Sequence, residues 1–207
     1  MAKKENFVTP AGTLVFGFIA EPNYEYKDDG EYLASIVLPA KEAKPIIEQI
    51  DNWIEESVKE AKKKNPKKKV VKADPPYADS VDEEGEPTGD YIIKFKSPAS
   101  GTSRRTGKRW ERTVPVFDAK RHPVNLDEVN LAPGSKIKIA YSEYFWFATG
   151  KAGVKLNLNG VQIIELNSGG QSADAFGFDE EDGVDLAVEE VENGSEEEDY
   201  EEDEPLF

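Results

Sequence analysis

The chain has 207 residues, 42 of them acidic and 26 basic, and its formal net charge at pH 7 is −16. It has no cysteine and a single histidine, His122, which excludes disulfides and cysteine nucleophiles and argues against a histidine-based metal site or catalytic triad. No run of about 20 apolar residues spans a membrane, and the opening Met1-Ala2-Lys3-Lys4 lacks the apolar core of a signal peptide, so we expect a cytoplasmic protein.

The first third of the chain predicts two strands and a helix. Apolar residues alternate at Leu14, Phe16 and Phe18, which predicts a strand over roughly 13–20, and a similar alternation predicts a second strand over about 31–38. Apolar residues then recur at helical spacing, so residues 43–62 are expected to form an amphipathic helix. We assign Trp53, on its apolar stripe, to the core.

Seven lysines lie between Lys62 and Lys72, where Asn65-Pro66 ends the predicted helix. This cluster is either an exposed basic loop or a surface for nucleic acid or a partner protein, and the pattern does not decide between the two. Residues 73–90 are predicted to form a long polar loop.

Four more strands are predicted, over residues 91–97, 110–118, 135–147 and 153–166, with Gly160 marking a bulge. Short strands, one early helix and no βαβ rhythm predict a mainly β protein. The OB-fold, a five-stranded Greek-key barrel, is a small barrel of this type, here with one inserted α-helix. Because six predicted strands exceed five, one of them is either an extra edge strand or part of a long bent one.

A basic hairpin is predicted between the strands near 95 and 112. Guanidinium groups pair with phosphates, and an aromatic ring offers a face for base stacking that is worth roughly 1–3 kcal/mol per base. We therefore predict contacts with a sugar-phosphate chain, against the alternative of a solvated hairpin tip. The candidate residues here are Arg104, Arg105, Lys108, Arg109, Trp110 and Arg112, and the strand before them adds Lys94 and Lys96, which alternate with apolar residues.

The strand predicted over 135–147 carries a second candidate surface. Alternation sends Ile137, Ile139 and Tyr141 to the core, and it places two cations and two rings on the other face if the register holds. These four are Lys136, Lys138, Tyr144 and Trp146. Together they would form a stacking platform, whereas Phe145 and Phe147 are assigned to the core. The competing interpretation is that the rings only fill the barrel, and a bulge would exchange the faces.

The net charge belongs to the end of the chain. Residues 172–207 hold 17 Asp and Glu and no Lys or Arg, which leaves 25 acids and all 26 bases in residues 1–171. A block of like charge repels itself and stays solvated, so we predict a folded domain over 1–171 and a disordered acidic tail over 172–207. The tail is either a solubilising terminus or a mimic of a nucleic-acid backbone that ends in an anchor for partner proteins.

No catalytic pattern is found in the sequence. The acids of the body are scattered, the segment 101–107 lacks the Gly-Lys-Ser/Thr end of a Walker loop, and the acids at 82–84 do not match a calcium loop. We expect a protein that is not an enzyme and needs no cofactor or metal.

At this point the chain resembles the bacteriophage single-stranded DNA-binding proteins of podovirus replication systems, which have an OB-fold and an acidic C-terminal tail. The resemblance rests on the order of several weak motifs. These are Met1-Ala2-Lys3-Lys4, the helix between the second and third strands, Lys94-Phe95-Lys96 with the basic hairpin, Gly134-Ser135-Lys136-Ile137-Lys138, the aromatic segment from Tyr141 to Trp146, Gly153-Val154-Lys155-Leu156, and the acidic tail ending in Phe207.

The resemblance implies a protein that coats single-stranded DNA without sequence preference in replication, recombination and repair, in the host cytoplasm. It adds Lys3 and Lys155 to the DNA-binding candidates. It also implies that the tail, through Glu204, Leu206 and Phe207, contacts the replicative DNA polymerase and the helicase-primase, and that the protein forms a homodimer. The arginine-rich hairpin and the lysine cluster depart from the family pattern.

We therefore expect the tail to occupy the DNA-binding face until DNA displaces it. Two alternatives stay open, namely an acidic-tailed interaction protein or chaperone for basic partners, and a binder of RNA or duplex DNA, because the same cations suit any polyphosphate.

Overall fold

The structure is a computed structural model that describes residues 6–82, 84–103 and 105–169. Lys3, Arg104 and the tail over 172–207, with Glu204, Leu206 and Phe207, lie outside the described residues. The domain boundary at 171/172 and the disorder of the tail therefore stay predictions.

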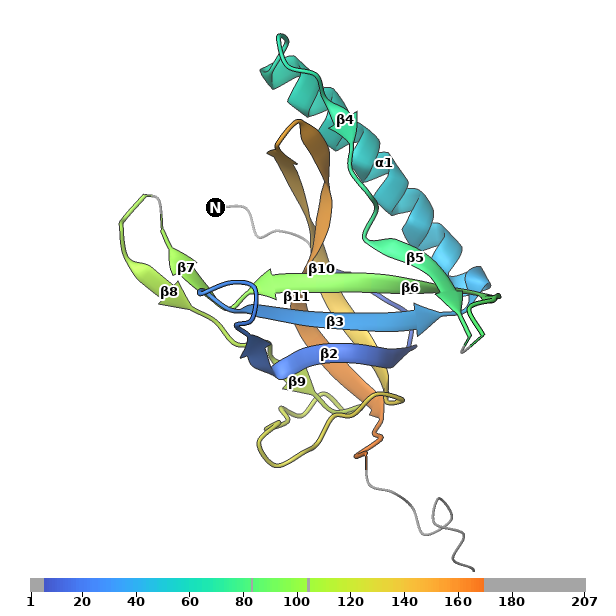
Figure 1. The fold of residues 1–207 in the computed structure, drawn as a ribbon. Coiled ribbons are helices and arrows are strands. Elements are labelled where there is room, and N and C mark those ends of the chain that lie inside the picture. Colours follow the sequence, from blue (N-terminus) through green and yellow to red (C-terminus); the bar gives the residue numbers. More distant parts are fainter. Residues whose placement is uncertain (1–5, 83, 104, 170–207) are drawn as a thin grey trace, which may run out of the picture. The chain divides into compact units, whose positions relative to one another are not determined.

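The described residues are mainly β with one helix (Figure 1). In chain order the elements are β1 (Phe7–Val8), β2 (Gly12–Asn23), β3 (Glu31–Leu38), α1 (Ala40–Lys64), β4 (Val71–Lys72), β5 (Tyr77–Val81), β6 (Pro87–Pro98), β7 (Ser100–Thr102), β8 (Arg109–Glu111), β9 (Val116–Phe117), β10 (Lys136–Ala148) and β11 (Lys151–Glu165).

Five long strands build a barrel in the order β11-β10-β2-β3-β6, and every pair along this path is antiparallel. The barrel closes where β11 lies against β6, and there the Ser97 hydroxyl of β6 donates a 2.7 Å hydrogen bond to the carbonyl of Leu158 on β11. This is the predicted OB-fold, with α1 inserted between the second and third barrel strands (Figure 1). The short strands β1, β4, β5 and β9 pair with it at its edges.

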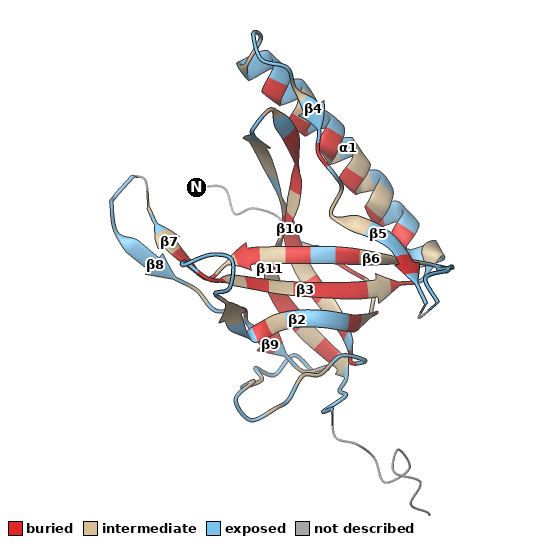
Figure 2. Ribbon diagram, in the orientation of Figure 1, coloured by how far each residue is buried: buried red, intermediate tan, exposed pale blue. Residues whose placement is uncertain are grey.

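The core fills the inside of the barrel and the space beneath α1 (Figure 2). On the helix, buried residues recur every three or four positions, so one stripe faces the barrel. They are Ala43, Ile46, Ile50, Ile54, Ser57 and Ala61. The Ser57 hydroxyl donates a 2.9 Å hydrogen bond to the Gly153 carbonyl of β11, and Trp53 packs against the core with its ring centroid 5.1 Å from that of Phe7, as predicted. No helix among the described residues is long and apolar enough to cross a membrane.

Two sequence predictions need correction. The segment 73–90 is not a continuous loop, because it contains β5 and the start of β6. β5 pairs only with β6, so it is an edge strand that tolerates polar residues and lacks a clear apolar alternation. The strand predicted over 110–118 divides into β8 and β9, with Pro115, which has no N–H to donate to a ladder, between them.

The buried stripe of α1 makes the helix part of the core, so its apolar side chains should carry stability. Ile54 is fully buried, and Ile54→Ala should lower the free energy of unfolding by about 2–5 kcal/mol through lost burial and the cavity left behind. Its neighbour Glu55 is exposed, so Glu55→Ala should change the free energy of unfolding by no more than about 0.5 kcal/mol. Urea unfolding followed by circular dichroism measures both, and equal effects would contradict this packing.

Candidate nucleic-acid interface

One extra residue in β2 turns two phenylalanines outward. The pairing of β2 with β3 steps from Leu14↔Ile36 to Phe16↔Ser35, which leaves Val15 unpaired as a β-bulge. Side chains alternate across a strand, so one extra residue exchanges the two faces. Leu14 is therefore inside at 2% exposure, whereas Phe16, two residues later, is 53% exposed. Phe18, half-buried, follows Phe16 on the outer side.

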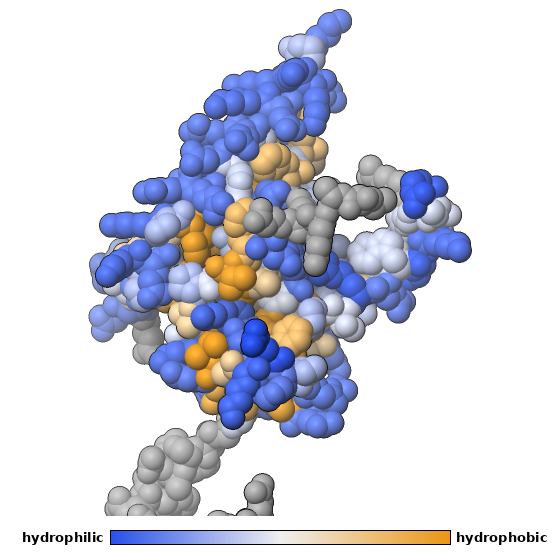
Figure 3. Space-filling model, turned by 180° about the vertical axis from the view of Figure 1, so that it is seen from behind, coloured by the Kyte–Doolittle hydropathy of each residue, from blue (hydrophilic) through white to orange (hydrophobic). Residues whose placement is uncertain are grey.

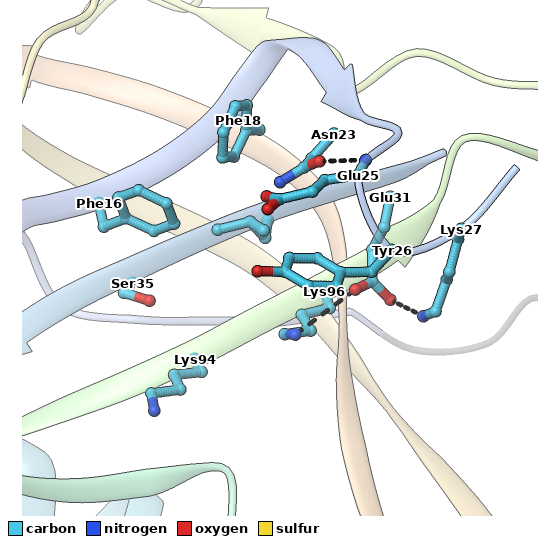
Figure 4. A pocket seen from close by; sticks show the side chains of 11 residues that line it. Phe16, Phe18, Asn23, Glu25, Tyr26, Lys27, Glu31, Ser35, Lys94 and Lys96 are labelled. Atoms are coloured by element: carbon cyan, nitrogen blue, oxygen red, sulfur yellow. Dashed lines mark hydrogen bonds and ion pairs between the residues drawn. The ribbon is translucent and has the colours of Figure 1, made fainter. Parts of the chain in front are cut away.

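The outward rings belong to a groove made of two hollows that share Lys94 and Lys96 of β6. The first, of about 400 Å³, is lined by Phe16, Phe18, Asn23, Glu25, Tyr26, Lys27, Glu31, Leu33, Ser35, Lys94 and Lys96 (Figure 4). The second, of about 530 Å³, is lined by Asp74, Pro76, Lys94, Lys96, Tyr144, Trp146, Val154 and Lys155. We call the two together the aromatic groove. It crosses the outer face of β2, β3 and β6 and reaches the hairpin of β10 and β11.

Rings line both halves of the groove and leave faces open. Phe16 and Phe18 meet edge to face with centroids 5.4 Å apart, and Tyr26 is 82% exposed. In the second hollow Tyr144 is 53% exposed, and Trp146 is half-buried because its indole lies over Gly153. A Cβ at Gly153 would come within 3.2 Å of that indole, so glycine makes the close approach possible. Rings held with a free face suit stacking by planar ligands.

The lysines of the groove are partly neutralised from within. Glu31 forms an ion pair with Lys27, and the Lys96 ammonium lies 3.4 Å from its other oxygen. Burial alone would raise the pKa of Glu31, but the hydrogen bond and charge of Lys27 and the charge of Lys96 outweigh it and hold that pKa below its usual value. Glu31 is therefore ionised at neutral pH.

Lys155 is a partly buried cation of the groove. Burial lowers its pKa, the charge of Glu31 acts in the opposite direction, and the ammonium lies 5.4 Å from the centre of the Tyr144 ring. It sits opposite Tyr144 in the β10–β11 ladder, so the two side chains share a face. A cation and a ring are thus presented side by side to whatever enters the groove.

The basic hairpin of β7 and β8 projects from one end of the barrel (Figure 1) and does not line the groove. Two of its arginines are engaged within the protein. Arg109 donates a 3.0 Å hydrogen bond to the Ser100 hydroxyl, and Arg112 donates one of the same length to the Leu158 carbonyl. Trp110, 38% exposed, packs against Gly101 of its own hairpin. Arg105 and Lys108 are exposed.

The platform expected from alternation along β10 is not assembled as a unit. Tyr144 and Trp146 share the aromatic groove, but Lys136 forms a 2.8 Å ion pair with Glu165, and Lys138 lines a separate apolar hollow with Arg121 and Phe117. The strand is 13 residues long, so its two ends lie too far apart to line one hollow. Phe145 packs against the core as predicted, whereas Phe147 is half-buried outside it. Whether any predicted residue contacts DNA stays a prediction.

Three residues that sequence reasoning missed as site residues are Phe16, Phe18 and Tyr26. The first two were seen as members of an apolar alternation, and only the bulge at Val15, which leaves no residue-type signature, places them outside. No group of three or more His, Cys, Asp or Glu side chains that could hold a metal ion occurs in the part of the chain that the structure describes.

Comparison with known proteins identifies the family. The family model described as single-stranded DNA-binding protein, bacteriophage T7, matches residues 12–166. The chain belongs to this family. The single-stranded DNA-binding protein of Escherichia phage T7 is 29% identical over 196 residues, covering 84% of this chain and 81% of that protein. Its counterpart in Enterobacteria phage T3 is 27% identical over 225 residues, covering 98% of this chain and 94% of that protein.

Solved structures agree with the family assignment. The crystal structure of gp2.5, a single-stranded DNA-binding protein encoded by bacteriophage T7, has a TM-score of 0.68 and 26% identity, covering 90% of this chain and all of that chain. The single-stranded DNA-binding protein from bacteriophage Enc34, solved in complex with single-stranded DNA, has a TM-score of 0.55 at 16% identity, covering 78% of this chain and 87% of that one. The second likeness supports the fold alone.

The bulge at Val15 places Leu14 and Phe16 on opposite faces of β2, so we expect the two side chains to contribute differently to stability. Leu14→Ala should lower the free energy of unfolding by about 2–5 kcal/mol, because a buried side chain is removed from the core. Phe16→Ala should lower it by no more than about 1 kcal/mol, because half of the larger ring already faces solvent. Parallel denaturant titrations decide, and a Phe16 variant as unstable as the Leu14 variant would place that ring in the core.

Proposed function

We propose that the protein binds single-stranded DNA without sequence preference and that the aromatic groove is its binding site. The observation that carries this proposal is the combination of outward rings from β2 and β10 with the lysines of β6 and β11 in two adjoining hollows that share Lys94 and Lys96. Proteins that bind single strands without sequence preference use a positive groove that tracks the backbone and rings on which bases stack. The family membership of the chain supports the same function.

In this proposal each kind of side chain has one task. Lys94, Lys96 and Lys155 contact phosphates, and Lys27 joins them when DNA displaces it from Glu31. Phe16, Phe18, Tyr144 and Trp146 stack on bases, and because every base has a π face, stacking does not discriminate between sequences. The exposed Arg105, Lys108 and Trp110 of the projecting hairpin guide the strand where it leaves the barrel.

The cellular role rests on the family and on the tail. We propose that the protein covers single-stranded DNA during phage replication, recombination and repair in the host cytoplasm. Its tail, with 17 acids in 36 residues, competes with DNA for the groove and, once displaced, recruits the replicative polymerase and the helicase-primase. Homodimer formation belongs to the same proposal. The descriptions of the phage T7 and T3 relatives support the DNA-binding part of this role.

Stacking predicts that removal of a groove ring weakens binding to oligo(dT). Phe16→Ala and Trp146→Ala should each reduce the affinity by about 5- to 150-fold, the equivalent of roughly 1–3 kcal/mol per stacked base. Phe117→Ala removes a partly exposed ring that does not line the groove and serves as the matched control. Fluorescence anisotropy of labelled oligo(dT) at one salt concentration measures all three.

An unchanged affinity for both groove variants would contradict the proposed site. The same assay with duplex DNA and RNA competitors tests the ligand class. Single-stranded DNA should compete best, and equal competition by all three would favour a general polyphosphate binder. A protein that binds none of them but binds basic proteins tightly would be the acidic-tailed interaction protein instead.

Tail competition predicts a gain of affinity on truncation. Deletion of residues 172–207 should tighten oligo(dT) binding, most strongly at low salt, because an intramolecular polyanion competes with DNA and salt screens that competition. Full-length and truncated proteins are compared over a series of salt concentrations. Unchanged or weaker binding by the truncated protein would argue against competition while leaving the groove itself untouched.

A further inference from the structure

A cluster of free lysines lies at the end of α1, outside the aromatic groove. We call Lys62, Lys63, Lys67, Lys68 and Lys69 the lysine tip. All five are exposed, and none lies within ion-pair distance of an acid among the described residues, in contrast to Lys64, which pairs with Glu60 at 2.8 Å. The end of the molecule where α1 terminates is almost uniformly hydrophilic when seen from behind (Figure 3).

The lysine tip is joined to the groove by the hairpin of β10 and β11. Along its ladder Tyr144 faces Lys155, Trp146 faces Gly153, and Ala148 faces Lys151. Paired residues of an antiparallel ladder share a face, so Lys151 continues the surface on which Tyr144 and Trp146 lie. The step from Tyr144 to Ala148 covers about 13 Å at roughly 3.3 Å per residue, and it leads out of the groove toward the hairpin turn.

The chain after α1 runs beside that turn. The Val71 amide donates a 2.9 Å hydrogen bond to the Gly150 carbonyl, and a Cβ on Gly150 would lie 3.4 Å from the Lys69 carbonyl. The backbone of the lysine tip is therefore in contact with the end of the hairpin. Lys151, whose ammonium is 3.9 Å from an oxygen of the exposed Asp74, stands between the groove and the tip.

We propose that the lysine tip is a second phosphate-binding surface, which continues the path of the bound single strand beyond Trp146. This inference rests on the proposed function and concerns the length of DNA that the protein contacts. A DNA strand too short to leave the groove contacts only the rings and the groove lysines. A longer DNA strand passes Lys151 and reaches the tip. The ligand at the tip is the phosphate backbone alone, because the tip offers ammonium groups and no aromatic ring.

Charge supports this assignment. The charge of Lys63 acts on Glu60, but Lys67, Lys68 and Lys69 have no anion within ion-pair distance among the described residues. A phosphate that contacts these three lysines therefore displaces no ion pair seen in the described part of the chain, and each contact releases counterions from the DNA. The negative end of the helix dipole stabilises Lys62 and Lys63 at the last turn, but it does not act on Lys67 to Lys69, which follow the helix end at Asn65. A structural role for the helix end therefore accounts for only part of the cluster.

The experiment compares Lys67→Gln/Lys68→Gln/Lys69→Gln with a matched triple variant, Lys41→Gln/Lys44→Gln/Lys120→Gln. The control lysines are also exposed and form no ion pair with a described residue, and they lie at the start of α1 and in the turn after β9. Binding is measured with oligo(dT) of increasing length across the roughly 4–16 nucleotides that one OB-fold covers. Because both variants lose the same charge, any difference between them reports position.

We expect the tip variant to bind the shortest oligonucleotides with the same affinity as the wild type. As the oligonucleotide length grows, the affinity of the tip variant should become lower than that of the wild type. On long oligonucleotides the slope of log affinity against log salt should lose ~0.7 for each phosphate contact removed, or about 2 for the triple variant. The control variant should follow the wild type at every length.

Acetylation footprinting gives a readout that does not depend on affinity. At saturation, long oligo(dT) should protect Lys67 to Lys69 from the reagent, whereas short oligo(dT) should not, and Lys41, Lys44 and Lys120 should stay reactive with both. A tip variant equal to the wild type at all lengths, or lysines left unprotected by long DNA, would overturn the inference and point to a partner protein at the tip. Absence of DNA binding by the wild type would instead contradict the proposed function.

Discussion

The site depends on the alternation of side chains across a strand, which one extra residue can reverse. A barrel strand must fill the interior with one face, so its apolar residues are committed to the inside unless the register changes. In β2 the register changes at Val15, and consequently the side chain of Leu14 lies in the core whereas that of Phe16 lies on the outer face of the same sheet. A second irregularity, where Ala140 pairs with Gly160 and Tyr141 with Leu158, leaves Asn159 as the extra residue of β11. One bulge supplies rings to the groove, and the other bends the strand that closes the barrel.

The closure at β6 and β11 ties the strand that lines the aromatic groove to the basic hairpin. The carbonyl of Leu158, beside the bulge, accepts hydrogen bonds from the Ser97 hydroxyl at 2.7 Å and from the Arg112 guanidinium at 3.0 Å. Ser97 is fully buried on β6, the strand that presents Lys94 and Lys96, and Arg112 follows directly after β8. A charge-assisted bond to a carbonyl is stronger than a neutral one. Arg112 thus anchors the base of the hairpin to the barrel, while Arg105 and Lys108 farther along it face solvent.

The sequence predicted the strands and the helix whose apolar residues keep one regular spacing from end to end. β3, β10 and α1 follow one alternation or helical spacing, and most of their residues lie where the pattern placed them, including Tyr144 on the outer face and Phe145 against the core. Phe147, half-buried outside the core, is the exception on β10. At β2 the alternation predicted the strand but not the change of face at Val15, because a bulge is set by the pairing of two strands and leaves no mark in the composition of one. The sequence pattern failed over 73–90, where an edge strand needs a partner on one side only and so shows little apolar pattern. Lys136 and Trp146 do not line one hollow, because parity fixes the face of a side chain and not its position along a long strand.

The pairing of charges inside the groove constrains what can supply affinity there. Lys27 and Lys96 already share Glu31, so a phosphate that takes either lysine must break an ion pair, and part of the Coulombic gain is offset. Lys155 carries a further cost, since burial already disfavours its charged form. Stacking breaks no ion pair, and although the Tyr144 ring already lies near the Lys155 ammonium and Phe16 meets Phe18 edge to face, Phe16, Tyr26 and Tyr144 leave more than half of their surface in water. In the proposed complex the rings therefore set the affinity in the groove, and the lysines set the path of the backbone along it.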